Sequence, residues 1–156
     1  MSSESLLQSL TPLLESLSRI DTDDPGSSAS LASEFPMEGD QMSRIRELVV
    51  EGIAEGWLTP RGEEGLRYGR LTKATSGSFG FSIDAVLMDR PGPGHLHPKG
   101  EIDLCFATRG EPRFDGEAEG WVVKSPGTWH IPTVSGGEMA ILYFLPEGAI
   151  VFGPRP

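Results

Sequence analysis

The sequence predicts a mainly β protein, a sandwich or single jelly-roll barrel preceded by an α-helical N-terminal extension. Apolar residues near the N-terminus recur at helical spacing, whereas short segments of alternating apolar and polar residues follow from Leu66 onward. Gly- and Pro-rich turns separate these short segments, which is typical of sandwiches and jelly rolls. A chain of 156 residues has room for one domain. We therefore expect a helical segment over residues 1–60 and a β-barrel over residues 61–156.

The first element is an amphipathic helix. Its apolar stripe has spacings of three and four and consists of Leu6, Leu10, Leu13, Leu17 and Ile20. Thr11-Pro12 interrupts the stripe, because proline lacks the backbone N–H that a helix interior requires. We expect a kink there, or two short helices that meet at the proline.

A polar connection and a second helix follow. Residues 21–40 are rich in Ser, Asp, Gly and Pro, so we expect an exposed, poorly ordered, flexible linker. Asp40 is a candidate N-cap for the second helix, and Gly56 lies near its end. The apolar face of this helix consists of Met42, Ile45, Val49 and Ile53.

The remaining segments are expected to be strands. Residues 79–88 alternate between two sets of side chains, as a half-buried strand does. Further strands are expected at Ile102–Ala107, Trp121–Lys124, Met139–Leu145 and Ala149–Phe152. The turn signals between them are Pro91-Gly92-Pro93-Gly94, Gly110-Glu111, Asp115-Gly116, Pro126-Gly127 and Gly136-Gly137.

Charge and composition exclude several classes of function. The formal net charge is −10, and Lys and Arg are not clustered, so nucleic acid is not an expected partner. No apolar run is long enough to span a bilayer, and the N-terminus lacks a signal-peptide pattern, so we expect no membrane association and a cytoplasmic protein. The single cysteine, Cys105, excludes an internal disulfide.

The three histidines of the chain form a candidate metal site. His95 and His97 are two residues apart, so on a strand both imidazoles face the same side. The turn Pro98–Gly100 then brings Glu101 to the same interior, and His130 approaches from another strand. Three imidazoles and one carboxylate suit a divalent first-row metal (Fe, Mn, Zn, Ni or Co) and leave positions open for water or substrate.

Three residues on the strand after the histidine pair have open roles. Glu101 is a fourth metal ligand, a general acid/base, or a residue that orients a histidine. Asp103 is two residues after Glu101, so both side chains should lie on the same face of the strand. A buried aspartate is costly unless it is paired, so we consider Asp103 a second catalytic carboxyl. The alternative is a strand register that turns Asp103 outward. Cys105 is interpreted as a small core residue.

Basic residues on an earlier segment are candidates for binding a substrate. Tyr68 and Arg70 share one strand face, and arginine pairs well with a carboxylate. Arg67 is a third candidate, although a regular strand points it the other way. Arg113 is a weaker candidate, and a solvated basic surface is the alternative for all of these arginines.

The histidine segments carry a resemblance to a known superfamily. GPGHLHPKGE resembles the first cupin motif, and GWVVKSPGTWH resembles the second, with all three histidines on ligand positions. The chain departs from the pattern at Gly110, at the adjacent Pro126-Gly127 and at Val134, none of which is a proposed ligand.

A closer resemblance extends over most of the chain. The strings GLRYGRLTK, GFSIDAVLMD, HPKGEIDLCF, RFDGEAEGWVVKSPGTWHIPTVSGG and ILYFLPEGAI are similar to the 4-hydroxylaminobenzoate lyase family of small cupin-like enzymes. This resemblance implies conversion of 4-hydroxylaminobenzoate to 3,4-dihydroxybenzoate with release of ammonia, as part of nitroaromatic degradation. In that reaction Glu101 or Asp103 would move protons, and Arg70 would hold the ring carboxylate.

Other functions remain open on the same scaffold. Three histidines can also bind ferrous iron for a dioxygenase. The barrel could instead bind a small acid without catalysis, or hold a metal for structure alone. We expect a small aromatic acid as the ligand and a homodimer as the assembly, because symmetric dimers are common and the leucine stripe needs a partner surface.

Overall fold

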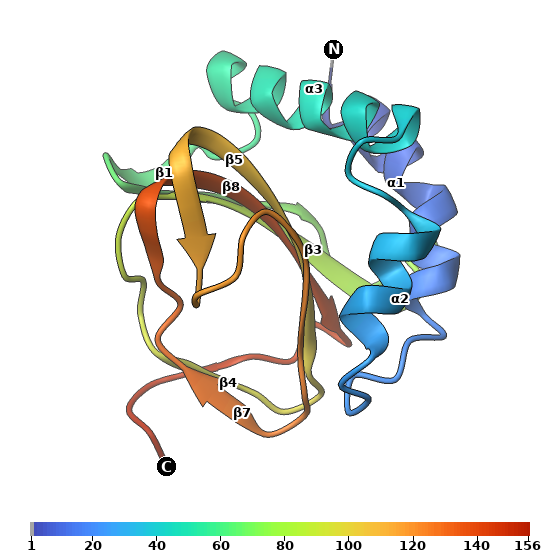
Figure 1. The fold of residues 1–156 in the computed structure, drawn as a ribbon, viewed down its shortest axis with the longest axis vertical. Helices are drawn as coiled ribbons and strands as arrows, with labels where there is room; N and C mark the ends of the chain where they lie inside the picture. Colours follow the sequence, from blue (N-terminus) through green and yellow to red (C-terminus); the bar gives the residue numbers. More distant parts are fainter. Residues whose placement is uncertain (1) are drawn as a thin grey trace.

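The computed structural model describes residues 2–156 and has two β-sheets that face each other, with three helices on the outside (Figure 1). The helices are α1 (Ser3–Leu17), α2 (Ser27–Glu34) and α3 (Asp40–Glu55). The strands are β1 (Arg61–Glu63), β2 (Leu66–Thr72), β3 (Phe81–Met88), β4 (His95–His97), β5 (Glu101–Phe114), β6 (Gly120–Lys124), β7 (Thr128–His130), β8 (Val134–Pro146) and β9 (Val151–Phe152).

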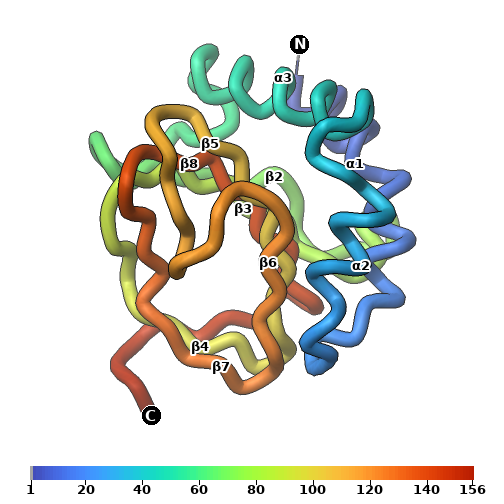
Figure 2. The backbone as a smooth tube through the Cα atoms, viewed as in Figure 1, coloured from blue at the N-terminus to red at the C-terminus, as the bar shows by residue number. Residues whose placement is uncertain are grey.

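The strand order confirms a jelly-roll-like fold. The larger sheet has the order β1-β2-β3-β8-β5-β6, and the smaller has the order β7-β4-β9. All pairings within both sheets are antiparallel. Figure 2 shows β4 and β7 across the interior from β5 and β8. No strand ladder joins the two sheets within residues 2–156, so hydrogen bonds do not close the barrel.

The helices cover the outer face of the larger sheet. A single apolar core joins buried leucines of α1 and α3 to outward residues of the strands, among them Ile83, Leu104 and Phe144. Figure 1 shows α1, α2 and α3 on one side of the molecule, and the small sheet on the far side of the interior. In the described part of the chain no helix is both long and apolar enough to cross a membrane.

The first helix is continuous, so the alternative expectation of two short helices that meet at Pro12 is wrong. α1 passes through Pro12, and Thr11 Oγ1 donates a hydrogen bond to the Leu7 carbonyl at 2.9 Å. An internal proline costs about 3 kcal/mol, whereas each fully buried leucine contributes about 1.5–3 kcal/mol. The buried leucines of α1 are Leu6, Leu10, Leu13, Leu14 and Leu17, so their burial outweighs the cost of the proline.

The segment expected as a flexible linker is largely structured. Residues 21–40 contain α2, whose Leu31 is fully buried. Phe35 packs beside Trp121 at a ring distance of 6.1 Å and accepts a hydrogen bond from the Trp121 Nε1 through its carbonyl at 3.2 Å. Leu31 and Phe35 thus belong to the apolar core, and Phe35 holds this segment against β6.

Three boundaries also differ from the expectation. The N-cap of α3 is Gly39, and Asp40 is the first helical residue, whereas Gly56 ends the helix with a φ of 86° as expected for a C-terminal glycine. β5 continues through Gly110-Glu111, and β8 continues through Gly136-Gly137. The ladder between these strands has irregularities there, so the glycines mark bulges in one long hairpin, not turns.

Candidate metal centre and adjoining cavity

The three histidines lie side by side on the small sheet. His95 and His97 are on β4, and His130 on β7 is the direct register partner of His95. The alternation of β4 turns both of its imidazoles inward, where His95 and His97 are buried. The ligand atoms of all three histidines lie within 4.8 Å of one another. The structure thus brings together the three residues that the sequence predicts as ligands.

The Nε2 atoms of the three rings converge. His130 Nε2 lies 2.9 Å from His97 Nε2 and 3.0 Å from His95 Nε2. His95 Nδ1 donates a hydrogen bond to the Pro93 carbonyl, and His130 Nδ1 donates one to Asp115 Oδ2 at 2.7 Å. When these rings carry a single proton, it lies on Nδ1, so Nε2 of each ring is unprotonated. The lone pairs of His95 Nε2 and His130 Nε2 then point at each other. Such an arrangement is repulsive unless a cation lies between the nitrogens.

The protonation of these rings suits metal binding. Burial, reinforced by the charge of His130, lowers the pKa of His95 to about 4. Burial and the neighbouring histidines lower the pKa of His97 to about 3. Both rings are therefore neutral at physiological pH, as a metal ligand must be. Two nitrogens on cis positions of one metal, each at about 2.1 Å, would be about 3 Å apart, so the observed spacing fits a metal ion.

Glu101 adds a carboxylate next to this cluster. Gly100, with a φ of 84°, turns the chain after β4, and its N–H donates to the His97 carbonyl at 3.2 Å. Glu101 Oε2 then lies 3.3 Å from His97 Nε2. Both Glu101 carboxyl oxygens are buried and lack a hydrogen-bond partner within residues 2–156. Glu101 stands outside the group of mutually close ligand atoms, so its role as a fourth ligand stays a prediction.

Asp103 lies on the same inner face as Glu101. Both of its oxygens are buried, and neither has a hydrogen-bond partner among the described residues. Burial raises the pKa of Asp103, and burial together with the charge of Asp103 raises the pKa of Glu101. Cys105, one alternation further, packs in the inner apolar cluster with Tyr143, and burial raises the pKa of its thiol. This agrees with the interpretation of Cys105 as a core residue.

One residue of the site was missed by sequence reasoning. Asp115 was assigned only to a turn, yet it accepts hydrogen bonds from His130 Nδ1 and the Thr133 N–H, and its Oδ2 lies 2.9 Å from Lys124 Nζ. Although burial alone would raise the pKa of Asp115, the bonds from His130 and Lys124 lower it to about 2. An ionised Asp115 thus fixes the His130 tautomer and points its Nε2 at the cluster.

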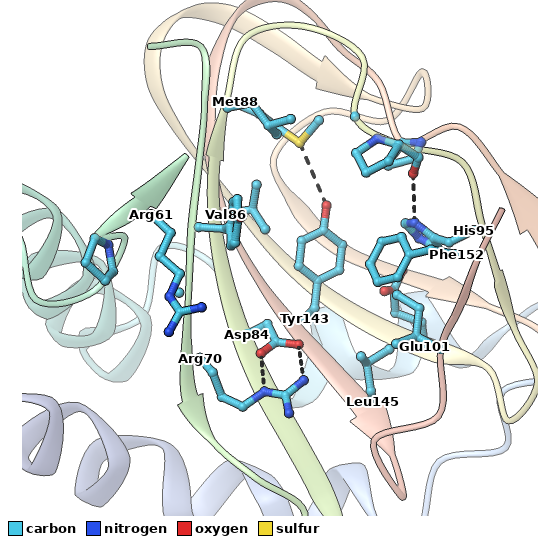
Figure 3. A pocket seen from close by; sticks show the side chains of 18 residues that line it. Arg61, Arg70, Asp84, Val86, Met88, His95, Glu101, Tyr143, Leu145 and Phe152 are labelled. Carbon is cyan, nitrogen blue, oxygen red and sulfur yellow. Dashed lines mark hydrogen bonds and ion pairs between the residues drawn. The ribbon is translucent and has the colours of Figure 1, made fainter. Parts of the chain in front are cut away.

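A cavity of about 750 Å³ opens beside the histidines (Figure 3). His95 and Glu101 form part of its wall, and most other lining residues are apolar, including Val86, Met88, Leu145 and Phe152. Phe152 also stacks edge-on against His95 at a ring distance of 5.4 Å. The cavity is large enough for a single-ring aromatic molecule, and it places that molecule against the candidate metal centre.

Only some of the candidate substrate-binding residues lie at the cavity. Tyr68 and Arg70 line the cavity, whereas Arg67 is not among the lining residues and donates from Nε to the Thr59 carbonyl at 3.3 Å. Arg113 is also outside the lining and donates to the Gly116 carbonyl. Arg61 lines the cavity too; its three-residue strand β1 is too short to produce a sequence pattern.

The jelly-roll-like fold and the three converging imidazoles define a class of protein, the cupins, with histidines placed to hold a metal ion. The sequence also identifies the family, because residues 11–152 match the family described as PnbB, 4-hydroxylaminobenzoate lyase. The chain belongs to this family.

Two curated relatives carry the same description. The 4-hydroxylaminobenzoate lyase of Pseudomonas putida is 29% identical over 140 residues, which cover 78% of this chain and 80% of the relative. That of Nocardioides sp. (strain LMS-CY) is 32% identical over 123 residues, which cover 72% of this chain and 73% of the relative.

Solved structures resemble parts of this fold more distantly. An oxalate oxidase in complex with glycolate is 18% identical with a TM-score of 0.41, covering 58% of this chain and 56% of the oxidase. A putative acetylacetone dioxygenase from Methylibium petroleiphilum is 17% identical with a TM-score of 0.42, covering 60% of this chain and 69% of that chain.

Proposed function

We propose that this protein is a metal-dependent lyase that converts 4-hydroxylaminobenzoate and water into 3,4-dihydroxybenzoate and ammonia. The observation that carries the proposal is the convergence of three imidazoles on one point at the wall of an apolar cavity. The family and both curated relatives support the substrate. Substrate plus one water contains the same atoms as the two products, so the reaction needs no oxidant or reductant.

The candidate site would hold one divalent metal through His95, His97 and His130, with Glu101 as a candidate fourth ligand. When bound, this metal supplies Lewis-acid stabilisation of the negative charge that develops on the hydroxylamine oxygen as the N–O bond breaks. Fe, Mn, Zn, Ni and Co all suit imidazole and carboxylate ligands.

The chain's own residues provide positioning and proton transfer. The apolar walls formed by residues such as Val86 and Met88 hold the ring and limit the access of water to it. Glu101 faces the cavity, and in its alternative role, as a general acid instead of a metal ligand, its buried carboxyl would deliver a proton to the departing oxygen. Asp103, behind Glu101 on the same face of β5, would exchange that proton with Glu101.

The test is turnover of 4-hydroxylaminobenzoate by protein of known metal content, with and without oxygen. We expect ammonia and 3,4-dihydroxybenzoate in equal amounts under both conditions. We expect the His97→Ala variant to lose bound metal and to fall to the uncatalysed rate, since His97 contributes one of three converging nitrogens. Circular dichroism of this variant checks that the barrel remains folded.

Other outcomes would point elsewhere. Oxygen consumption that matches turnover would contradict the lyase and favour an iron dioxygenase. A His97→Ala variant that unfolds would show that the metal stabilises the barrel, and the chelated wild-type protein then provides the comparison of activity. Binding of the acid without product under any condition would favour a binding protein.

A further inference from the structure

We propose that Arg61 binds the carboxylate of the aromatic substrate, and that Arg70 instead neutralises Asp84 on the cavity wall. This inference rests on the proposed function only for the identity of the substrate; the recognition of an aromatic carboxylate can be tested without turnover. Sequence reasoning assigned the carboxylate to Arg70, and three features of the structure favour Arg61.

The first feature is the register of the strands that form the wall. Arg61 on β1 is the partner of Tyr68 on β2, and Tyr68 is the partner of Val86 on β3. Neighbouring residues in register lie on the same face of a sheet. Tyr68 and Val86 line the cavity, and so does Arg61. The guanidinium of Arg61 therefore belongs to the same inner surface as the ring-binding residues.

The second feature is the difference in pairing between the two cavity arginines. Arg70 Nε lies 2.8 Å from Asp84 Oδ1, and Arg70 Nη2 lies 3.3 Å from Asp84 Oδ2, so the pair is bidentate. Within residues 2–156 Arg61 has no hydrogen bond or ion pair to a side chain. A substrate carboxylate can thus use the donors of Arg61 without breaking an existing ion pair.

The third feature is the charge that Asp84 would otherwise present. Asp84 lines the cavity, and a bare carboxylate there would repel an anionic substrate. The hydrogen bond that Arg70 donates to Asp84 raises the pKa of Arg70, as expected for a stable ion pair. The pair is close to neutral, which leaves Arg61 as the net positive charge among the described lining residues.

The position of Arg61 also gives the substrate a direction. Figure 3 shows Arg61 on one side of the cavity with the Asp84–Arg70 pair, and His95 with Phe152 on the other side. The apolar side chains of Val86 and Met88 and the ring of Tyr143 are drawn between these two sides. An aromatic acid with a para substituent would have its carboxylate at Arg61 and the substituent directed to the metal centre.

The experiment compares two ligands that differ only in charge at one end, 4-hydroxybenzoate and 4-hydroxybenzamide, by calorimetry on metal-loaded protein. Wild-type protein should prefer the benzoate. Arg61→Gln should weaken benzoate binding about 10- to 50-fold, since charge-assisted hydrogen bonds are lost, and should leave amide binding within about twofold. Arg61→Lys should recover part of the loss, and Arg67→Gln, on the other face of the same hairpin, should bind both ligands as wild type does.

A double variant separates the two roles of the arginines. Arg70→Gln alone should weaken benzoate binding because it exposes the charge of Asp84, and Asp84→Asn combined with Arg70→Gln should restore it. A double variant that binds benzoate as weakly as Arg70→Gln alone would show that Arg70 itself holds the carboxylate, and would overturn the proposal. Unchanged benzoate binding in Arg61→Gln, or equal loss of both ligands, would overturn it as well. Selective loss of the benzoate in protein without lyase activity would support Arg61 and reject only the substrate.

Discussion

The two faces of the six-stranded sheet are built from the same strands but serve different purposes. On β5, Ile102, Leu104 and Phe106 face outward and belong to the apolar core shared with the helices. The intervening residues, Glu101 and Asp103, face inward toward the histidines and have no hydrogen-bond partner in the described chain.

The two faces contribute to the free energy of folding with opposite signs. Each apolar residue of the outer face contributes favourable burial of about 25 cal/mol per Å². Each buried carboxyl of the inner face costs free energy unless a cation or a proton neutralises it. At this part of β5 the outward side chains therefore stabilise the fold, whereas Glu101 and Asp103 on the inner face are retained for their chemistry, beside the inner apolar cluster that contains Cys105 and Tyr143.

Among the variants that compare the two faces, Asp103→Asn on the inner face should have the largest effect on activity. We expect turnover to fall by about 10²–10⁴, the usual contribution of proton transfer by a side chain, because Glu101 loses the partner that exchanges its proton. The free energy of unfolding should change by less than about 1 kcal/mol, since the amide has nearly the same shape as the carboxyl and can form a hydrogen bond with Glu101. Steady-state kinetics and urea unfolding measure the two quantities. Full activity in this variant would remove Asp103 from the mechanism.

The adjacent residue on the outer face should give the opposite result. Leu104→Ala removes a fully buried side chain and should lower the free energy of unfolding by about 2–5 kcal/mol. Turnover per folded molecule and metal content should stay within about twofold, because Leu104 points away from the cavity. A loss of metal in folded Leu104→Ala protein would show that the two faces are not independent.

The sequence was most informative where alternation or spacing controls the geometry. The parity of Glu101, Asp103 and Cys105 follows from strand alternation, so their common inward face was predictable. The convergence of the histidines was predictable for the same reason, because His95-Leu96-His97 can only present two rings to one side of a strand.

Features that depend on long-range docking were not predictable from the chain. The helix over Ser27–Glu34 is stabilised because Leu31 and Phe35 join the core formed with distant parts of the chain. The polar composition of residues 21–40 predicted a flexible linker, because such distant contacts are not visible in the local sequence. Arg70 was assigned to the substrate because its partner Asp84, fourteen residues away in the sequence, could not be identified before the register of β2 and β3 was known. Arg61 lies on a strand of three residues, which has no periodicity to detect.

The smallest effect is expected at Asp115, which supports the metal centre indirectly by accepting a hydrogen bond from His130. Asp115→Asn keeps a hydrogen-bond acceptor near His130 Nδ1 but removes the charge that also binds Lys124. Loss of such a supporting carboxylate usually lowers metal affinity about 10- to 100-fold, and competition with a chelator measures it. The matched variant Asp89→Asn, at an exposed ion pair with Arg90, should leave the affinity unchanged. Because the contacts with His130 and Lys124 lower the pKa of Asp115 to about 2, the metal-free Asp115→Asn protein should lose up to about 2 kcal/mol of unfolding free energy near neutral pH. A larger loss would mean that the His130–Asp115–Lys124 contacts stabilise the fold itself, and that the division between the two faces is incomplete.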